Sequence, residues 1–190
     1  MDSLLQSLES EKRALRAQVR ERMPKPGSPE QVAASVAAQT RLATSDLVAP
    51  ARLIALYRAL PSECGTAALA AQLEALGRAI CYPVVAAGER MLSFRRAAGV
   101  FVSGALGIEE PTGSAVSLEE IDLIVVPAIA VDERGGRMGR GRGHYDATLG
   151  VCRATPVALV FETQLVPRVP LGEHDRPVRA ICTEARLIRA

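Results

Sequence analysis

The sequence is poor in aromatic side chains. It contains no tryptophan, three tyrosines and three phenylalanines among its 190 residues. Alanine, valine, leucine and isoleucine must therefore fill the interior, and a hydrophobic content of 48% is typical of a soluble protein with a real core. An excess of charge of one sign is also lacking. The basic and acidic residues nearly balance, and the net charge of only +2 argues against nucleic acid as the main partner.

Cysteines and long apolar runs are few as well. The four cysteines, Cys64, Cys81, Cys152 and Cys182, are scattered without the spacing of a metal site, so we expect free thiols in a reducing cytosol. No apolar run approaches the length of a membrane span, and the charged, helical N-terminus does not resemble a signal peptide. We expect a cytoplasmic monomer with no membrane partner, forming a single domain over residues 1–190.

The most informative stretch runs from Asp122 to Leu149. Asp122–Val126 is a β-branched run, as expected of a strand buried on both faces of a parallel sheet. Asp132–Gly136 has the composition of a turn. Glycines then alternate with arginines over residues 137–143, and a helix is predicted from near His144 to Leu149.

The chemistry of this glycine-rich loop points to a polyanion. Glycine lets backbone N–H groups approach a ligand closely, and a helix N-terminus offers partial positive charge. Arg137, Arg140 and Arg142 add planar donors that match phosphate or carboxylate oxygens. Asp146 is placed to hold a divalent cation that bridges phosphates. Two alternatives stay open: a surface hairpin that binds nothing, and one that contacts nucleic acid nonspecifically.

The same stretch resembles the signature of the 5-formyltetrahydrofolate cyclo-ligase family, also called 5,10-methenyltetrahydrofolate synthetase. Family members carry a D-L-hydrophobic-P strand and turn, followed by R-hydrophobic-G-x-G-x-G-Y-Y-D. The positions in register with that pattern are Asp122, Leu123, Pro127, Asp132, Arg137, Met138, Gly139, Gly141, Gly143, Tyr145 and Asp146. A long, ordered match is more specific than a glycine triplet, although His144 replaces the first tyrosine of the pair.

Two helices are predicted at the start of the chain. The first covers residues 3–22, and the second runs from Pro29, with Ser28 as its cap, to about Thr44. The basic residues of the first helix would by themselves indicate only a solvated face. Three positions match the family's opening K-x-x-L-R helix, whose basic residues reach the nucleotide phosphates: Lys12, Leu15 and Arg16.

The first strand is predicted over Arg52–Tyr57, followed by a loop and a helix that ends near Leu76. In an open α/β sheet, ligands bind in the loops beyond the carboxyl ends of strands. Family members place here a glutamate that contacts the pterin, with threonine or a small residue three positions later, and Glu63 and Thr66 match. By itself, Glu63 would indicate only a carboxylate favourable at a helix start. Arg58 stands where the family usually has an apolar side chain that lines the substrate.

Further strands are predicted at Ala79–Val85, Met91–Arg95, Val157–Phe161 and Ala180–Thr183, with Gly107–Pro111 as an extended lead-in to the central strand. The family carries an acidic segment before its last strand, whose aspartate helps to hold magnesium, and Asp175 matches it. Arg179 replaces a further aspartate of the family. His174 is expected to form a hydrogen bond within its loop, because no second histidine lies at ligand spacing.

Strands that alternate with helices predict an α/β fold. We expect three layers, α/β/α, with a mostly parallel central sheet and an N-terminal helical arm. The resemblance implies the same architecture, and no internal repeat interrupts the pattern.

The resemblance also implies a reaction: the ATP- and magnesium-dependent cyclisation of 5-formyltetrahydrofolate to 5,10-methenyltetrahydrofolate, with release of ADP and phosphate. The formyl oxygen would attack the γ-phosphoryl group, and the neighbouring folate nitrogen would then displace phosphate. Such chemistry needs positioning and charge stabilisation rather than a protein nucleophile. Two alternatives are a homologue that binds folate or nucleotide without efficient turnover, and an RNA-associated module that uses the arginine-glycine loop.

The site residues that the resemblance implies fall into four groups. Catalysis is assigned to Arg140, Arg142 and Tyr145. ATP binding is assigned to Lys12, Leu15, Arg16, Arg137, Met138, Gly139, Arg140, Gly141, Arg142, Gly143, His144 and Tyr145. Folate binding is assigned to Arg58, Glu63, Arg140, Gly141, Arg142, Gly143 and His144, and magnesium to Asp146 and Asp175.

Overall fold

The computed structural model describes residues 2–104 and 107–190, with side chains from residue 6 onward. It opens with two helices, α1 (Asp2–Arg22) and α2 (Pro29–Ala43), close to the predicted bounds. The Ser28 hydroxyl caps α2 by accepting a hydrogen bond from the Gln31 backbone N–H at 3.2 Å. No helix among the described residues is long and apolar enough to cross a membrane.

An eight-stranded sheet forms the centre of the described structure, in the order β12-β11-β10-β7-β1-β2-β3-β6. Its strands are β1 (Leu53–Ala55), β2 (Ala79–Val84), β3 (Ser93–Arg96), β6 (Ala115–Val116), β7 (Leu123–Val126), β10 (Thr155–Leu159), β11 (Ala180–Cys182) and β12 (Leu187–Arg189). The strands from β11 to β2 are parallel, whereas the outer pairings, β12 with β11, β3 with β2 and β6 with β3, are antiparallel. Two separate ribbons pair β4 (Phe101–Ser103) with β5 (Glu109–Pro111), and β8 (Ala130–Val131) with β9 (Arg137–Met138).

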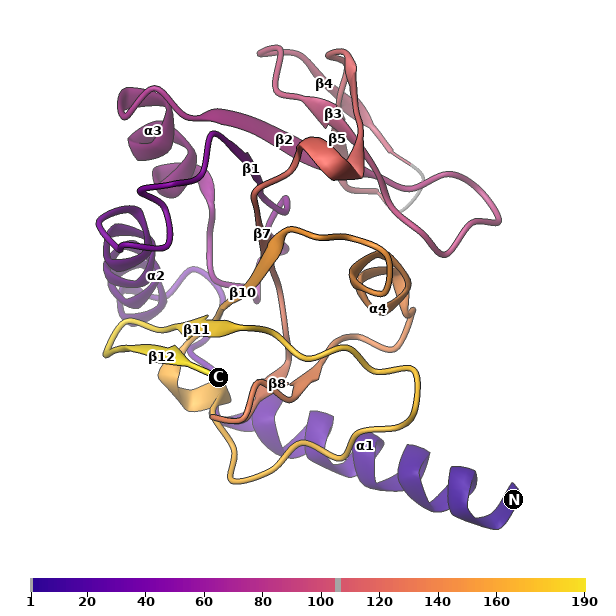
Figure 1. Ribbon diagram of the computed structural model, residues 1–190. Helices are drawn as coiled ribbons and strands as arrows, with labels where there is room; N and C mark the ends of the chain where they lie inside the picture. Colours follow the sequence, from indigo (N-terminus) through magenta and orange to yellow (C-terminus); the bar gives the residue numbers. More distant parts are fainter. Residues whose placement is uncertain (1, 105–106) are drawn as a thin grey trace.

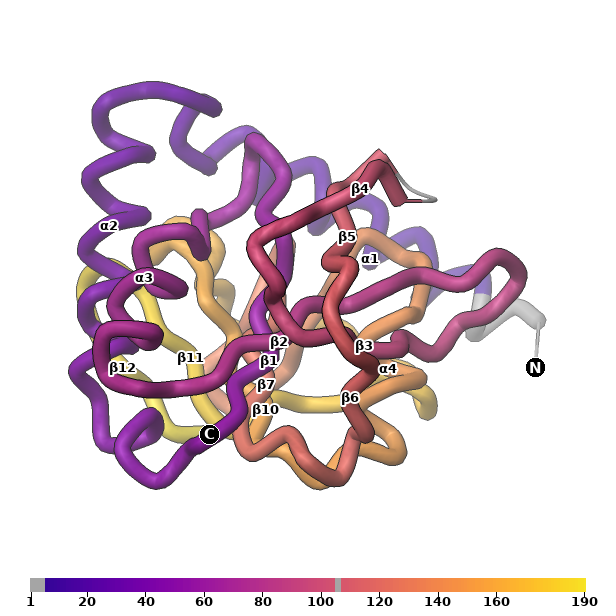
Figure 2. Tube along the Cα trace, turned by 90° about the horizontal axis from the view of Figure 1, so that it is seen from above, coloured from indigo at the N-terminus to yellow at the C-terminus, as the bar shows by residue number. Residues whose placement is uncertain are grey.

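Helices cover both faces of this sheet, as Figures 1 and 2 show. α2 and α3 (Ala67–Ala75) pack on one face over a core that includes Leu42, Leu69 and Leu123. α4 (His144–Leu149) covers the other face, over a core that includes Ile124 and Val160. The predicted three-layer α/β fold with a mostly parallel sheet is therefore confirmed.

The chain reverses direction across the sheet at β1. It passes from β1 through α3 to β2 on one side, and later returns to β7 on the other side. In open α/β sheets the carboxyl ends of two such strands border a crevice where ligands bind. α1 lies near this end of the sheet, against β8 and against the short 3₁₀ helix η2 (Glu162–Gln164) that follows β10 (Figure 1).

Several short elements differ from the prediction. The strand predicted over Arg52–Tyr57 is limited to β1, and Gly107–Pro111 is part of a hairpin with β4 rather than a simple lead-in to β7. β6, the β8–β9 ribbon and β12 were not predicted. Two or three residues carry too little periodicity to indicate a strand, so only the backbone pairing in the structure defines these elements: β6 with β3, β8 with β9, and β12 with β11.

Candidate functional site

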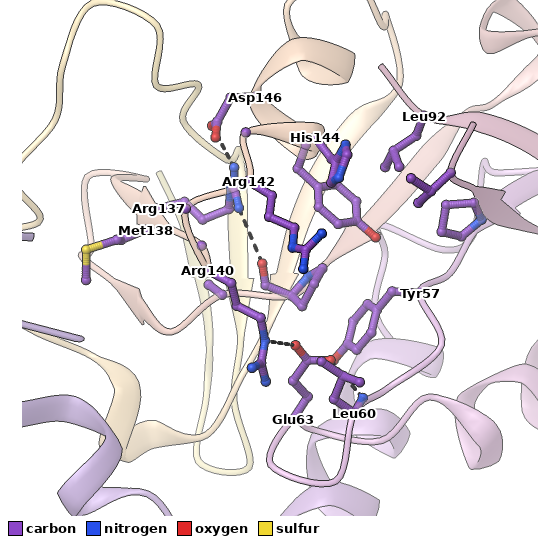
Figure 3. Close-up of a pocket in the computed structure, with 18 of the residues that line it drawn as sticks. Tyr57, Leu60, Glu63, Leu92, Arg137, Met138, Arg140, Arg142, His144 and Asp146 are labelled. Carbon is purple, nitrogen blue, oxygen red and sulfur yellow. Dashed lines mark hydrogen bonds and ion pairs between the residues drawn. The ribbon is translucent and has the colours of Figure 1, made fainter. Parts of the chain in front are cut away.

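A cleft of about 560 Å³ opens beyond the carboxyl ends of β1 and β7. Figure 3 shows side chains from the loop after β1 facing those of the loop that joins β9 to α4. The cleft brings together nearly all the predicted site residues: Lys12, Arg16, Arg58, Glu63, all positions from Arg137 to Asp146, and Asp175. Leu15 is not part of this lining, because it packs with Val19 and Met138 in a small apolar cluster under α1.

The glycine-rich loop, residues 139–143, is held against α1. The Arg16 Nε donates a hydrogen bond to the Gly139 carbonyl at 3.0 Å. Gly141 has a φ of +94°, which an L side chain rarely adopts, and a Cβ there would lie 3.5 Å from an Arg16 guanidinium nitrogen. Gly143, with a φ of +73°, then turns the chain into α4. The loop thus has a defined shape that positions its arginines at the cleft.

Arg140 crosses the cleft mouth to the opposite loop (Figure 3). Its Nε lies 3.0 Å from the Glu63 Oε1, and a terminal nitrogen donates to the Ser62 hydroxyl at 2.9 Å. The other Glu63 oxygen accepts from the Leu60 backbone N–H at 2.9 Å, which holds the carboxylate in place. The Glu63 side chain is 10% exposed, whereas that of Arg140 is 42% exposed and so remains accessible to an anion.

Arg137 is a buried cation at the base of the loop, with only 2% of the residue exposed. It donates to the Asp146 carboxylate at 2.6 Å and to the Pro127 carbonyl at 3.4 Å. The Arg176 backbone N–H donates to the same Asp146 oxygen at 3.2 Å. The Arg137 Nε is buried and has no partner among the described residues. Asp146 is therefore neutralised by Arg137 and fixes the start of α4.

Lys12 forms a second buried ion pair, on the α1 side of the cleft. Its Nζ lies 2.6 Å from Asp175 Oδ2, although the two residues are 163 positions apart in the sequence. The same carboxylate oxygen accepts from the Gly172 backbone N–H at 2.6 Å. Both side chains are largely buried, 9% and 18% exposed, so the pair joins α1 to the segment that precedes β11.

Two aspartates that the sequence analysis assigned to magnesium, Asp146 and Asp175, both border the cleft. Within the described ranges, no group of three or more His, Cys, Asp or Glu side chains is arranged to hold a metal. Magnesium in phosphate sites is commonly bound by one or two carboxylates, with water and phosphate oxygens completing its shell. Asp146 and Asp175 provide that number, and each is now paired with a cation.

Two tyrosines border the cleft in neutral form. Burial raises the pKa of Tyr57 well above its usual value, and its hydroxyl donates to the carbonyls of Cys64 and Leu159 at 2.6 and 3.2 Å. Burial, with a smaller contribution from Glu63, also raises the pKa of Tyr145. His144 Nδ1 lies 2.8 Å from the Arg90 carbonyl. At neutral pH the two tyrosine rings therefore add no charge to the cleft.

The opposite wall of the cleft is mainly apolar. It consists of side chains at the end of β2, in the following loop and beside β5: Pro83, Val85, Leu92 and Ile108, together with Leu60. Arg58 also borders this wall, and it pairs with Glu109 of β5. A flat, partly apolar ligand fits this side, whereas the cations lie toward α1 and the glycine-rich loop.

Sequence reasoning missed several residues of the lining. Glu9 and Arg20 border the cleft together with Lys12 and Arg16. These four positions are separated by three, four and four residues, which places them on one face of a helix. The sequence spacing could therefore have indicated that Glu9 and Arg20 lie on the same face of the helix as Lys12 and Arg16. Tyr57 and Leu92 had no comparable signal, because only the fold brings them to the cleft.

Comparison with known proteins points to one family. A model of the 5-formyltetrahydrofolate cyclo-ligase family matches residues 8–184. A curated 5-formyltetrahydrofolate cyclo-ligase of Mycolicibacterium smegmatis is 35% identical over 172 residues, which are 85% of this chain and 89% of the relative. The protein of that name from Escherichia coli K12 is 30% identical over 79% of this chain and 87% of its own. The solved structure of Aquifex aeolicus 5,10-methenyltetrahydrofolate synthetase superimposes with a TM-score of 0.79 at 26% identity, covering 94% of this chain and 92% of that one.

Proposed function

The chain belongs to the 5-formyltetrahydrofolate cyclo-ligase family, and on this premise we propose that it cyclises 5-formyltetrahydrofolate to 5,10-methenyltetrahydrofolate with ATP, releasing ADP and phosphate. One structural observation carries the proposal. The arginines of the glycine-rich loop, Lys12 on α1 and Glu63 after β1 all border one cleft, at the switch point of the sheet.

The triphosphate binds on the α1 side of the cleft in this proposal. Lys12 and Arg16 hold the non-transferred phosphates, and Arg140 and Arg142 stabilise the migrating phosphoryl group. Support comes from the clustering of cations here, and from the exposure of Arg140 and Arg142 at the cleft. Leu15 takes an indirect part, since it packs beneath the face of α1 that carries these cations.

The folate lies along the apolar wall, with its pterin at Glu63. The Glu63 carboxylate accepts hydrogen bonds well and is already oriented by the Leu60 N–H. When a pterin takes the Oε1 oxygen that now accepts from Arg140, that bond is released, and the guanidinium becomes available to phosphate. The Arg140–Glu63 pair therefore links the two halves of the cleft, so that folate binding prepares the phosphate half.

Magnesium would be held by Asp146 and Asp175 together with phosphate oxygens, and it supplies charge neutralisation when bound. The formyl oxygen attacks the γ-phosphorus and ADP leaves; the neighbouring nitrogen then attacks the formyl carbon, and phosphate leaves as the new C–N bond closes the ring. The protein's contribution is alignment of the two substrates and stabilisation of charge by Arg140 and Arg142.

A turnover assay tests the proposal. Purified protein with 5-formyltetrahydrofolate, ATP and magnesium should form methenyltetrahydrofolate and phosphate in equal amounts, with neither product when one substrate is omitted. A protein that only binds would be stabilised against thermal unfolding by the ligands yet release no phosphate, and that result would overturn the proposal. If RNA, and not folate, stabilised the protein against thermal unfolding, that result would contradict the proposal more strongly.

A further inference from the structure

The β4–β5 ribbon stands apart from the main sheet, and yet it forms part of the apolar wall of the cleft. β4 and β5 pair only with each other among the described strands, with Ser103 opposite Glu109 and Phe101 opposite Pro111. Ile108 and Glu110 of this ribbon segment line the cleft. The position of the ribbon therefore sets the width of the cleft on the side where the folate is proposed to lie. Figure 1 shows the ribbon on the side of the sheet that carries β2 and β3, and β5 is in contact with β2.

Arg58 is the residue that connects this ribbon to the loop after β1. Its guanidinium carbon lies 4.5 Å from the centre of the Phe101 ring on β4 and 5.9 Å from the centre of the Tyr82 ring on β2. The Phe101 and Tyr82 rings meet edge to face at 5.5 Å. A terminal nitrogen of Arg58 also pairs with the Glu109 carboxylate on β5. One side chain thus contacts both strands of the ribbon and one strand of the sheet.

A second contact holds the same ribbon at its cleft side. The Glu110 carboxylate accepts a hydrogen bond from the Val85 backbone N–H at 3.0 Å, just beyond the end of β2. Glu110 and Glu109 are neighbours in β5 and therefore point to opposite faces of the ribbon. The ribbon is held from both faces: by Glu110 on the cleft side, and by Arg58 through Glu109 and Phe101 on the other.

We propose that Arg58 is a positioning residue that sets folate affinity by holding the β4–β5 ribbon as a wall of the cleft. This inference rests on the proposed function and deepens it, since it names the part of the molecule that determines how tightly the folate is held. An arginine suits the task because its planar guanidinium stacks on an aromatic ring and pairs with a carboxylate at the same time. Neither a lysine nor an apolar side chain makes both contacts.

Steady-state kinetics of Arg58→Ala and Glu109→Gln test the role. Arg58→Ala should raise the KM for 5-formyltetrahydrofolate by about tenfold and leave the KM for ATP nearly unchanged. Glu109→Gln should raise the same KM by a smaller factor, although Glu109 is not part of the cleft lining. Arg58→Lys should restore only part of the loss. The folate KM of the double variant should equal that of Arg58→Ala alone, because both changes break the same connection between the loop after β1 and the β4–β5 ribbon.

Amide hydrogen exchange provides a readout that does not depend on activity. In the ligand-free protein, Arg58→Ala should speed exchange within β4 and β5 and leave β7 and β10 unaffected. Arg189→Gln is a matched control, because it removes an exposed ion pair with Asp46 at the far edge of the sheet; it should change neither the exchange nor the KM.

Three outcomes would overturn the inference. A rise in the folate KM for Arg58→Ala with no effect of Glu109→Gln and unchanged ribbon exchange would show that Arg58 contacts the substrate directly. Equal changes in the KM values for ATP and folate would show a general loss of structure. Unchanged kinetic constants in both variants would show that Arg58 has no role in folate affinity. If the unaltered protein does not turn over, the proposed function fails, and ribbon exchange alone decides whether Arg58 holds the ribbon.

Discussion

The two walls of the cleft are built in opposite ways. The wall toward α1 consists of charged side chains on a helix and a loop, and two of them are held by partners far away in the sequence, in the Lys12–Asp175 and Arg140–Glu63 pairs. The opposite wall consists mainly of apolar side chains at the end of β2, in the loop after it and beside β5, with Arg58 and Glu110 among them. The charged wall depends on ion pairs, whereas the apolar wall depends on how strands and a ribbon are packed.

This difference has a consequence for binding. A charged side chain that already has a partner must exchange that partner for the ligand. Its contribution to affinity is therefore only the difference in free energy between the contact with the ligand and the ion pair that it replaces. An apolar wall needs no exchange, and its contribution follows from the area covered and from rigidity. Changes in the charged wall should therefore alter turnover and ATP binding strongly, and changes in the apolar wall should alter folate binding more modestly.

Arg140→Ala should have the largest effect. Because Arg140 is proposed to stabilise the migrating phosphoryl group, kcat should fall by roughly 10²–10³-fold, with thermal stability retained since this side chain is 42% exposed. Arg134→Ala is the matched control, an exposed arginine in the β8–β9 turn outside the cleft. Near-normal turnover in Arg140→Ala would refute its assignment.

Lys12→Met should have the second largest effect. Loss of a charge-assisted contact to phosphate should raise the KM for ATP by roughly tenfold to a hundredfold, while the KM for folate changes little. Asp175 also loses its partner, so some thermal stability should be lost with it. Arg13→Ala, on the solvent side of the same helix, should leave both KM values unchanged. Equal effects of the two variants would mean that α1 contributes only general positive charge.

Glu63→Gln should act on the folate side of the comparison. The amide keeps the size of the side chain and removes the negative charge, so the KM for 5-formyltetrahydrofolate should rise about fivefold. The KM for ATP should stay nearly constant or fall slightly, because Arg140 is freed from its ion pair. Glu119→Gln, on an exposed 3₁₀ helix, serves as the control. A larger change for ATP than for folate would reverse the proposed arrangement of the two walls.

Alkaline pH should produce the smallest effect, through Tyr57. Burial raises its pKa in the folded state, so the stability that it contributes is complete below the unfolded-state pKa of about 10 and is lost as pH rises above that value. The urea midpoint of the unaltered protein should fall between about pH 10 and 11.5, and less steeply in Tyr57→Phe.

Three buried thiols act in the same direction, which is why the comparison uses the difference in slope. Burial raises the pKa of each of Cys64, Cys81 and Cys182 to about 12, so they also favour the folded state less as pH rises above the ordinary thiol range. Equal slopes for the unaltered protein and Tyr57→Phe would show that Tyr57 does not titrate differently in the folded and unfolded states.

Sequence reasoning was most successful where a pattern extends over many residues. The two N-terminal helices, the buried β7 strand and α4 were predicted nearly to the residue, because capping, hydrophobic runs and glycine turns act locally. The family resemblance read from the Asp122–Asp146 stretch is confirmed by the match over residues 8–184. The short β4–β5 and β8–β9 ribbons were missed, because strands of two or three residues carry too little periodicity, even though each ribbon pairs neighbouring segments of the chain.

The sequence by itself determined the alternation of helices and strands and the glycine-rich, arginine-bearing loop, since both follow from local propensity and from the order of residue types. The tertiary structure alone decided that Lys12 pairs with Asp175, that Arg140 pairs with Glu63, and that Arg58 stacks on Phe101. Each pair joins segments that are far apart in the chain and that only the folded structure brings together, so no pattern of neighbouring residues encodes these contacts.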